Sequence, residues 1–195
     1  CDAGTRVDIV GTHLDREEVD LIRAAGRHPR LPTPVPPSLS AHHIEELEGL
    51  LATGPDLLVI GVSSPGVRWA ADQIVAGLTA QGTGTPLPCP PIVMLTKGLD
   101  VGAANVRPFP HLVAELLQAG GIAPPAVGGI GGPCIAGELA ERRHSSVVLG
   151  GPDTVFLDRV ARLLRTPYYH VETTIDLAGL EVAAALKNFY TIAVG

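Results

Sequence analysis

Two apolar runs decide the fold class, DLLVIGV at residues 56–62 and PIVMLT at residues 91–96. Neither run shows the alternation of apolar and polar residues that is typical of a strand with one face in water. Strands of this kind belong to parallel sheets that helices cover on both faces. Residues 65–77, which lie between the two runs, favour such a helix. A strand, a helix and a second strand in this order predict a parallel α/β sheet with right-handed crossovers.

The same alternation continues on both sides of this unit. We expect further strands at residues 6–10, 126–130, 146–149 and 168–172, and helices at residues 15–25, 44–51, 110–118, 133–142 and 154–164. The pattern changes at residues 177–194, which form one helix that is apolar nearly all round. Because such a helix needs packing partners on every side, we expect one α/β domain in residues 1–173 and the start of a second, helical domain in residues 174–195.

The composition excludes several classes of protein. The chain has 195 residues, of which 46% are hydrophobic, and a formal net charge of -6. It has no run rich in lysine and arginine, so a nucleic acid partner is not expected. It also has no stretch of about 18 consecutive apolar residues, which argues against a membrane span. The cysteines (Cys1, Cys89 and Cys134) and the histidines show no metal-ligand spacing, so we expect no metal site and a reducing, cytoplasmic environment.

A single lysine interrupts the apolar helix at residues 177–194. Lys187 shares a helical face with Leu180 and Ala184, and a lysine held out of water there could act as a general acid or base near neutral pH. Alternatively, its chain runs along the apolar surface and its ammonium group reaches water. Asn188 would either anchor a substrate hydroxyl or orient the lysine, unless its amide only satisfies neighbouring backbone groups.

Two further features follow strands. Lys97 comes directly after the run at residues 91–96, and ligands of open parallel sheets bind beyond the carboxyl ends of the strands. A cation there suits an anionic substrate or a developing alkoxide, although a lone lysine at such a place is more often an exposed loop residue. The glycine-rich segment GGIGGP, residues 128–133, lies between a strand and a helix. Since Cys134 stands where the pattern G-x-G-x-x-G needs its third glycine, the segment by itself indicates a tight turn.

Three motifs together resemble those of the NAD(P)-dependent glycerol-3-phosphate dehydrogenase family. They are LTKGL at residues 95–99, GPCIAGEL at residues 132–139, and DLAGLE at residues 176–181, which continues into ALKN at residues 185–188. Their order and spacing agree with the family, and residues 62–64 resemble its strand end beside the nicotinamide. The resemblance covers nearly the whole chain, weakly before about Asp56 and strongly after about Pro91.

This resemblance implies an oxidoreductase that reduces dihydroxyacetone phosphate to sn-glycerol 3-phosphate with NADH or NADPH, for glycerophospholipid synthesis. The implied fold is α/β, a Rossmann-type parallel sheet that lacks its first strand, followed by the first helix of an all-helical substrate domain. Lys187 would be the proton acceptor, with Lys97 and Asn188 as further catalytic residues. The substrate would contact Lys97, Gly132, Cys134 and Lys187, and the cofactor would contact Thr12, His13, Ser63, Lys97 and Ala136.

The chain departs from the family pattern in three ways. Cys134 replaces a residue that is usually serine or threonine, and a thiol is a weaker hydrogen-bond donor. No G-x-G-x-x-G fingerprint occurs, so we expect a fragment truncated at both ends, inactive by itself, whose first strand precedes Cys1 and whose phosphate-binding residues follow Gly195. Gly11, Thr12 and His13 follow the strand at residues 6–10, where NAD-specific enzymes usually place an acid. Use of both NAD and NADP, or a preference for NADP, is therefore expected.

Two other kinds of protein remain open at this point. A related ketopantoate reductase or hydroxyacid dehydrogenase also uses lysine and asparagine on a helix, but does not normally combine the three motifs. A non-catalytic ligand-binding or oligomerisation module is the second alternative, and a complete gene without the glycine fingerprint would favour it. For the full-length protein we expect a small phosphorylated substrate, a homodimer and a cytoplasmic location.

Overall fold

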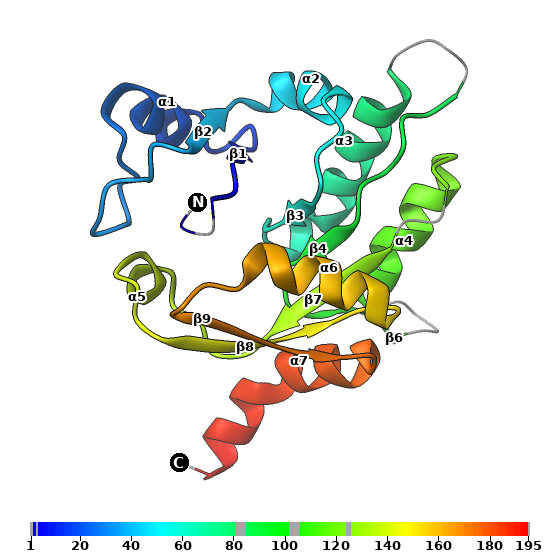
Figure 1. Ribbon diagram of the computed structural model, residues 1–195. Helices are drawn as coiled ribbons and strands as arrows, with labels where there is room; N and C mark the ends of the chain where they lie inside the picture. The colour runs from blue at the N-terminus through cyan, green and yellow to red at the C-terminus, as the bar shows by residue number, and fades with distance from the viewer. Residues whose placement is uncertain (1, 3, 81–84, 102–105, 124–125, 195) are drawn as a thin grey trace.

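The structure of the chain is a computed structural model that describes residues 2, 4–80, 85–101, 106–123 and 126–194. The side chains of residues 188–191, 193 and 194 lie outside the description. Helices and strands alternate along the described chain, and helices lie on both sides of a central sheet (Figure 1). The α/β class that the apolar runs predict is therefore confirmed.

The central sheet has five strands in the order β3-β4-β7-β8-β9. These strands are β3 (Leu58–Ile60), β4 (Ile92–Met94), β7 (Val127–Gly131), β8 (Ser145–Gly150) and β9 (Tyr169–Thr174). The neighbours β3, β4 and β7 run parallel, as expected. However, β8 runs antiparallel to β7, and β9 then runs parallel to β8. The sheet is therefore mixed, with one antiparallel step that the sequence did not predict.

The connection between β7 and β8 explains this antiparallel step. It contains one short helix, α5 (Ala136–Ala140), in place of the longer helix expected at residues 133–142. Parallel neighbours are usually joined by a helix long enough to lie across the sheet. A helix of 5 residues does not cross the sheet, so the chain turns back and β8 lies beside β7 in the opposite direction.

Two small sheets and the other helices complete the described fold. β1 (Val7–Val10) pairs in parallel with β2 (Leu39–His42), and β5 (Leu99–Val101) pairs antiparallel with β6 (Val106–Pro108). The helices are α1 (Arg16–Ala25), η1 (Ile44–Glu46), α2 (Leu47–Ala52), η2 (Ser64–Gly66), α3 (Val67–Thr79), α4 (Phe109–Ala119), α6 (Thr154–Leu164) and α7 (Leu177–Val194). The strands β2, β5 and β6 were not expected, because short strands with polar residues leave no apolar run in the sequence.

Two apolar cores lie on opposite faces of the central sheet. Ile92 and Met94 of β4 pack in the core that α3 and α4 cover, whereas Val93 packs in the core beneath α6. All three side chains are fully buried, as expected for a strand that helices cover on both faces. The helix α7 packs against β7 and β8. A β-carbon at Gly131 would lie 2.6 Å from Cδ1 of Leu180, so this glycine allows the close approach of helix and strand.

The strands β1 and β2 bond to each other and not, within the described residues, to the central sheet. The Rossmann-type sheet is thus present in two pieces. The division into a domain at residues 1–173 and a second one at residues 174–195 stays a prediction, since α7 is the one described element of the latter. Among the helices that the structure describes, none is both long and apolar enough to cross a membrane.

Candidate active site at the carboxyl ends of the strands

The segments that follow β3 and β4 are tied together at one edge of the sheet. Since β3 and β4 are parallel neighbours, their carboxyl ends lie at the same edge. There the hydroxyl group of Thr96, a largely buried residue, donates a hydrogen bond of 2.6 Å to the backbone oxygen of Val62. Residues 62–64 and Lys97, each of which the sequence places directly after a strand, therefore lie at one edge of the sheet.

Lys97 is fixed against the turn that follows β7. Its Nζ donates a hydrogen bond of 2.9 Å to the backbone oxygen of Gly132. Gly132 has a φ of 123°, and a β-carbon there would lie 3.1 Å from the Cα of Val147. The turn thus requires glycine for both its backbone angle and its space. The glycine-rich segment is mostly strand, because β7 extends to Gly131 and only Gly132 makes the turn.

The charges around Lys97 come from three other segments of the chain. Burial lowers the pKa of Lys97, and the positive charge of Lys187 lowers it further, while Cys134 and Glu181 act in the opposite direction. These four residues therefore lie close enough to interact electrostatically. The structure brings together the two lysines that the motifs single out, although they stand far apart in the sequence. The catalytic and substrate-binding roles expected for them stay predictions.

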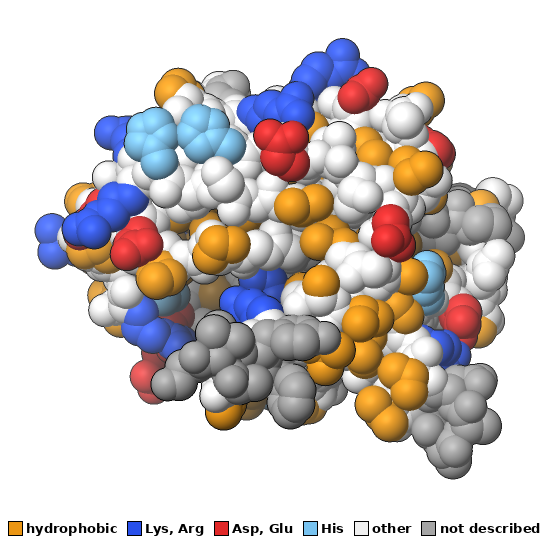
Figure 2. Space-filling view, turned by 90° about the horizontal axis from the view of Figure 1, so that it is seen from below, with side chains coloured by type: hydrophobic (Ala, Val, Ile, Leu, Met, Phe, Trp, Pro, Cys, Tyr) orange, Lys and Arg blue, Asp and Glu red, His pale blue; other side chains and the backbone are white. Residues whose placement is uncertain are grey.

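The structure distinguishes between the two alternatives for Lys187. The side chain of Lys187 is exposed, which agrees with an ammonium group that reaches water rather than with a lysine held out of water. The same helix exposes 41% of Val182, 41% of Leu186 and 82% of Ile192, so part of its apolar surface has no packing partner among the described residues. Figure 2 shows the underside of the molecule, where apolar and basic side chains both reach the surface. The side chain of Asn188 lies outside the described residues.

Glu181 is the residue of the site that sequence reasoning missed. Its side chain is only 1% exposed, although it stands on the otherwise apolar helix α7. Burial raises the pKa of Glu181 to about 7, and the positive charge of Lys97 acts against this rise. The sequence contained a sign that Glu181 is buried. Leu177 and Glu181 are four positions apart, so they share one face of the helix.

The residues expected to contact a cofactor lie at the ends of β1 and β3 and at the start of α5. The hydroxyl of Thr12 donates a 2.6 Å hydrogen bond to Oδ2 of Asp15, so this carboxylate binds Thr12 and makes no side-chain hydrogen bond to the start of α1. The ring of His13 meets that of Trp69 edge-on, with centroids 5.5 Å apart. Ser63, at the start of η2, and Ala136, the first residue of α5, are both exposed. Their contacts with a cofactor stay predictions.

Of the substrate residues, Cys134 lies in the turn between Gly132 and α5. It is a free cysteine and its side chain is exposed. Cys134 lies close enough to Lys97 to raise the pKa of that lysine. A small donor at this place could therefore reach a ligand of Lys97, and the predicted substrate contact of Cys134 remains open to test.

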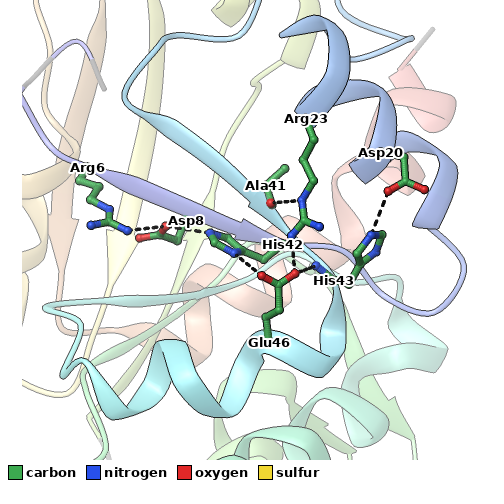
Figure 3. A network of polar contacts seen from close by, with 8 residues as sticks. All are labelled: Arg6, Asp8, Asp20, Arg23, Ala41, His42, His43 and Glu46. Carbon is green, nitrogen blue, oxygen red and sulfur yellow. Dashed lines mark hydrogen bonds and ion pairs between the residues drawn. The ribbon is translucent and has the colours of Figure 1, made fainter.

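A separate polar network holds the small sheet of β1 and β2 to η1. Nε2 of His42 lies 2.9 Å from Oδ1 of Asp8, and Nδ1 lies 3.1 Å from Oε2 of Glu46 (Figure 3). The backbone N–H of His43, the ring of His42 and the guanidinium of Arg23 together lower the pKa of Glu46 to about 2. The network joins three neighbouring elements at the surface, which gives it a structural role.

The central sheet with helices on both faces and charged residues at its carboxyl edge has the architecture of a Rossmann-type α/β protein. The glycerol-3-phosphate dehydrogenase of Coxiella burnetii matches the fold with a TM-score of 0.75 and 22% identity, over 96% of this chain and 59% of that one. A UDP-D-ManNAc dehydrogenase of Pyrococcus horikoshii matches with a TM-score of 0.68 and 14% identity, over 97% and 46%. At such identities the likeness concerns the fold alone.

Sequence comparison gives the family. The NADP(+)-dependent glycerol-3-phosphate dehydrogenase of Archaeoglobus fulgidus is 32% identical over 196 residues, which are 99% of this chain and 53% of that protein. A glycerol-3-phosphate dehydrogenase [NAD(P)+] of Mycobacterium avium is 38% identical over 144 residues, 74% of this chain and 38% of that protein. No family model matches the chain. The chain belongs to the glycerol-3-phosphate dehydrogenase family and spans about half the length of the curated relative from Archaeoglobus.

Proposed function

We propose that the protein carrying this chain is an NAD(P)H-dependent reductase of dihydroxyacetone phosphate, which forms sn-glycerol 3-phosphate in a reversible reaction and feeds glycerophospholipid synthesis. The family relationship supports this proposal, because the relatives named above are glycerol-3-phosphate dehydrogenases. The observation that carries it is the pair of cations at the carboxyl edge, with the ammonium group of Lys97 held on Gly132 and influenced by Lys187. The family relationship does not favour a ketopantoate reductase or a non-catalytic module.

The proposed roles of the lysines follow from the reaction. When bound, the reduced nicotinamide supplies a hydride to the carbonyl carbon of the substrate, and negative charge then develops on the carbonyl oxygen. Lys97 stabilises that charge from a position fixed by Gly132. Lys187 delivers the proton that completes the alcohol, and accepts it in the reverse direction. Asn188, next to Lys187, holds the substrate hydroxyl in this proposal.

The residues after β1 fit NADP as well as NAD. An NAD-specific site usually places a carboxylate there for the ribose hydroxyls. In this chain Gly11, Thr12 and His13 follow β1, and Oδ2 of the nearby Asp15 accepts hydrogen bonds from the backbone N–H and the hydroxyl group of Thr12. This arrangement supports dual use of NAD and NADP, with His13 beside the adenosine ribose. Ser63, Lys97 and Ala136 are the proposed contacts nearer the nicotinamide.

The reaction is tested with a panel of substrates on the full protein. We expect oxidation of NADH and of NADPH with dihydroxyacetone phosphate, and rates at least about 100-fold lower with ketopantoate, because a site that binds a polar group rejects substrates without it. Turnover of ketopantoate in preference to dihydroxyacetone phosphate contradicts the proposal. Strict dependence on NAD contradicts the proposed dual use alone.

The proposal extends to assembly and location. A homodimer in the cytoplasm, with no nucleic acid partner, is expected for a reductase of a small phosphorylated metabolite. Light scattering on the purified protein tests the dimer, since a monomer at micromolar concentration contradicts it. Cell fractionation tests the location.

A further inference from the structure

Glu181 occupies an unusual place between α7 and the central sheet. It is one helical turn beyond Leu177, and both residues face the sheet and are buried. Its Oε1 lies over Gly129 of β7 so closely that a β-carbon on this glycine would overlap with it. The absence of a side chain at Gly129 thus makes the space that the carboxyl group fills. Packing alone does not explain why an acidic residue, Glu181, fills this buried space.

One oxygen of this carboxyl group lacks a hydrogen bond. Among the described residues, no donor pairs with Oε2 of Glu181, and that atom is buried. Burying a charged or polar group without a partner costs free energy, so buried acids are usually paired with a cation or a donor. The cation whose charge acts on Glu181 is Lys97, and Glu181 in turn acts on Lys97.

Among the described residues, Lys97 is the charged group that acts on Glu181, while the titratable His111 of α4 lines a pocket with Leu177 at the start of α7. β7 and β8 carry no titratable side chain. The strands β5 and β6 carry Asp100 and Arg107, which pair with each other at 2.9 Å. Asp176, just before α7, accepts a hydrogen bond from the backbone of Gly179. On the side of Lys97, the remaining charged or titratable neighbours are Lys187 and Cys134.

We propose that Glu181 is a positioning residue of the active site, which acts through Lys97 by keeping its ammonium group protonated and directed to the turn at Gly132. This inference rests on the proposed function for its consequences in catalysis, but the electrostatic pair can be tested without it. Two influences work against a charged Lys97, namely its burial and the charge of Lys187. Glu181 counteracts both from inside the protein, where water screens the attraction little.

The pair gives the site a defined response to pH. Because burial raises the pKa of Glu181 to about 7, the carboxyl group is charged above that pH and neutral below it. The carboxylate of Glu181 therefore stabilises the charge of Lys97 above about pH 7, and this stabilisation is lost as the pH falls through that value. Since the two groups interact, the titration belongs to the pair rather than to Glu181 alone.

The test measures the reactivity of Lys97 directly. The chain has two lysines, Lys97 and Lys187, so acetylation by acetic anhydride at a series of pH values, read by mass spectrometry, reports each amine separately. At a pH above about 7 and below the wild-type pKa of Lys97, the full protein with Glu181→Gln should label about 10-fold faster at Lys97, which corresponds to a fall of one unit in that pKa. Glu181→Asp, which keeps a carboxylate, should restore most of the wild-type rate. Glu172→Gln, at an exposed glutamate of β9, is the matched control and should change nothing.

An equal labelling rate at Lys97 in wild type and Glu181→Gln, with unchanged circular dichroism, overturns the inference. If Glu181→Gln does not fold, Glu181→Met, which is uncharged and of similar size, takes its place with the same expected increase at Lys97, and a wild-type labelling rate in that variant overturns the pair. Kinetics supply an independent readout. In the wild type, the rate of ketone reduction should fall on the alkaline side as Lys97 loses its proton, and in Glu181→Gln this fall should occur about one pH unit lower, with a larger change in kcat than in KM. If the full protein has no dehydrogenase activity, the proposed function is wrong. The labelling experiment still tests the interaction between Glu181 and Lys97 in that case.

Discussion

Lys97 and Lys187 reach the same site on different structural supports. Lys97 follows the fully buried strand β4, and a hydrogen bond to Gly132 fixes its ammonium group. Lys187 stands on α7 beyond the buried turn that contains Leu177 and Glu181, and its side chain is exposed. The sheet therefore defines the position of the first lysine, whereas the position of the second depends on how α7 is held against β7 and β8. The fixed position of Lys97 suits an electrostatic role, whereas the proton transfer proposed for Lys187 rests on the resemblance of its motif to the family.

The largest effect is expected from Lys187→Ala. Loss of a general acid–base group should lower kcat by roughly 100-fold or more with little change in stability, because the side chain is exposed. Steady-state kinetics and thermal unfolding of the full protein measure both. Arg162→Ala on α6 is a control for removal of an exposed cation. A kcat within a few-fold of wild type shows that the proton comes from elsewhere.

Lys97→Ala should affect both substrate binding and rate. Removing a cation that stabilises developing charge costs on the order of 100-fold in kcat, and KM should rise because the same group contacts the anionic substrate. Lys97→Arg keeps the charge but not the fit to Gly132, so it should recover KM more than kcat. A Lys97→Ala variant that changes KM alone would restrict this lysine to binding and weaken the contrast with Lys187.

Gly132→Ala tests whether the turn holds Lys97. A side chain at a φ of 123°, 3.1 Å from the backbone of Val147, should lower the free energy of unfolding by about 1–3 kcal/mol and displace the carbonyl that binds Lys97. Chemical denaturation measures the stability, and KM for the substrate measures the displacement. The control is Gly137→Ala in α5, where a β-carbon meets no atom within 4 Å. Equal stability of the two variants would show that the turn tolerates a side chain.

The smallest effect is expected from Thr96→Val, which removes the hydrogen bond between the segments after β3 and β4. The backbone oxygen of Val62 then loses its 2.6 Å partner, and the free energy of unfolding should fall by about 1 kcal/mol. Denaturant unfolding provides the measurement, and Thr79→Val at the exposed end of α3 is the control. A neutral result would mean that the sheet edge keeps its shape without this bond.

Much of the fold was predictable because its signals are local. The apolar runs of β3 and β4 indicated buried parallel strands, and the helices α6 and α7 agree with the expected bounds. The antiparallel step between β7 and β8 was not predictable, because an apolar strand looks the same in either direction. The short strands β2, β5 and β6 also left no signal, since pairing with a neighbour and not their composition makes them strands.

The candidate site also has features that the sequence indicates and features that only the structure shows. The sequence by itself singled out the two lysines as candidates for the chemistry, because Lys97 and Lys187 stand in motifs whose order and spacing are typical of one family. Only the tertiary structure decided how they are held. It placed Lys97 on the carbonyl of Gly132, left Lys187 exposed, and buried Glu181 over Gly129. The physical reason is that motifs record residue types along the chain, whereas burial and the pKa shifts it causes depend on which segments pack together.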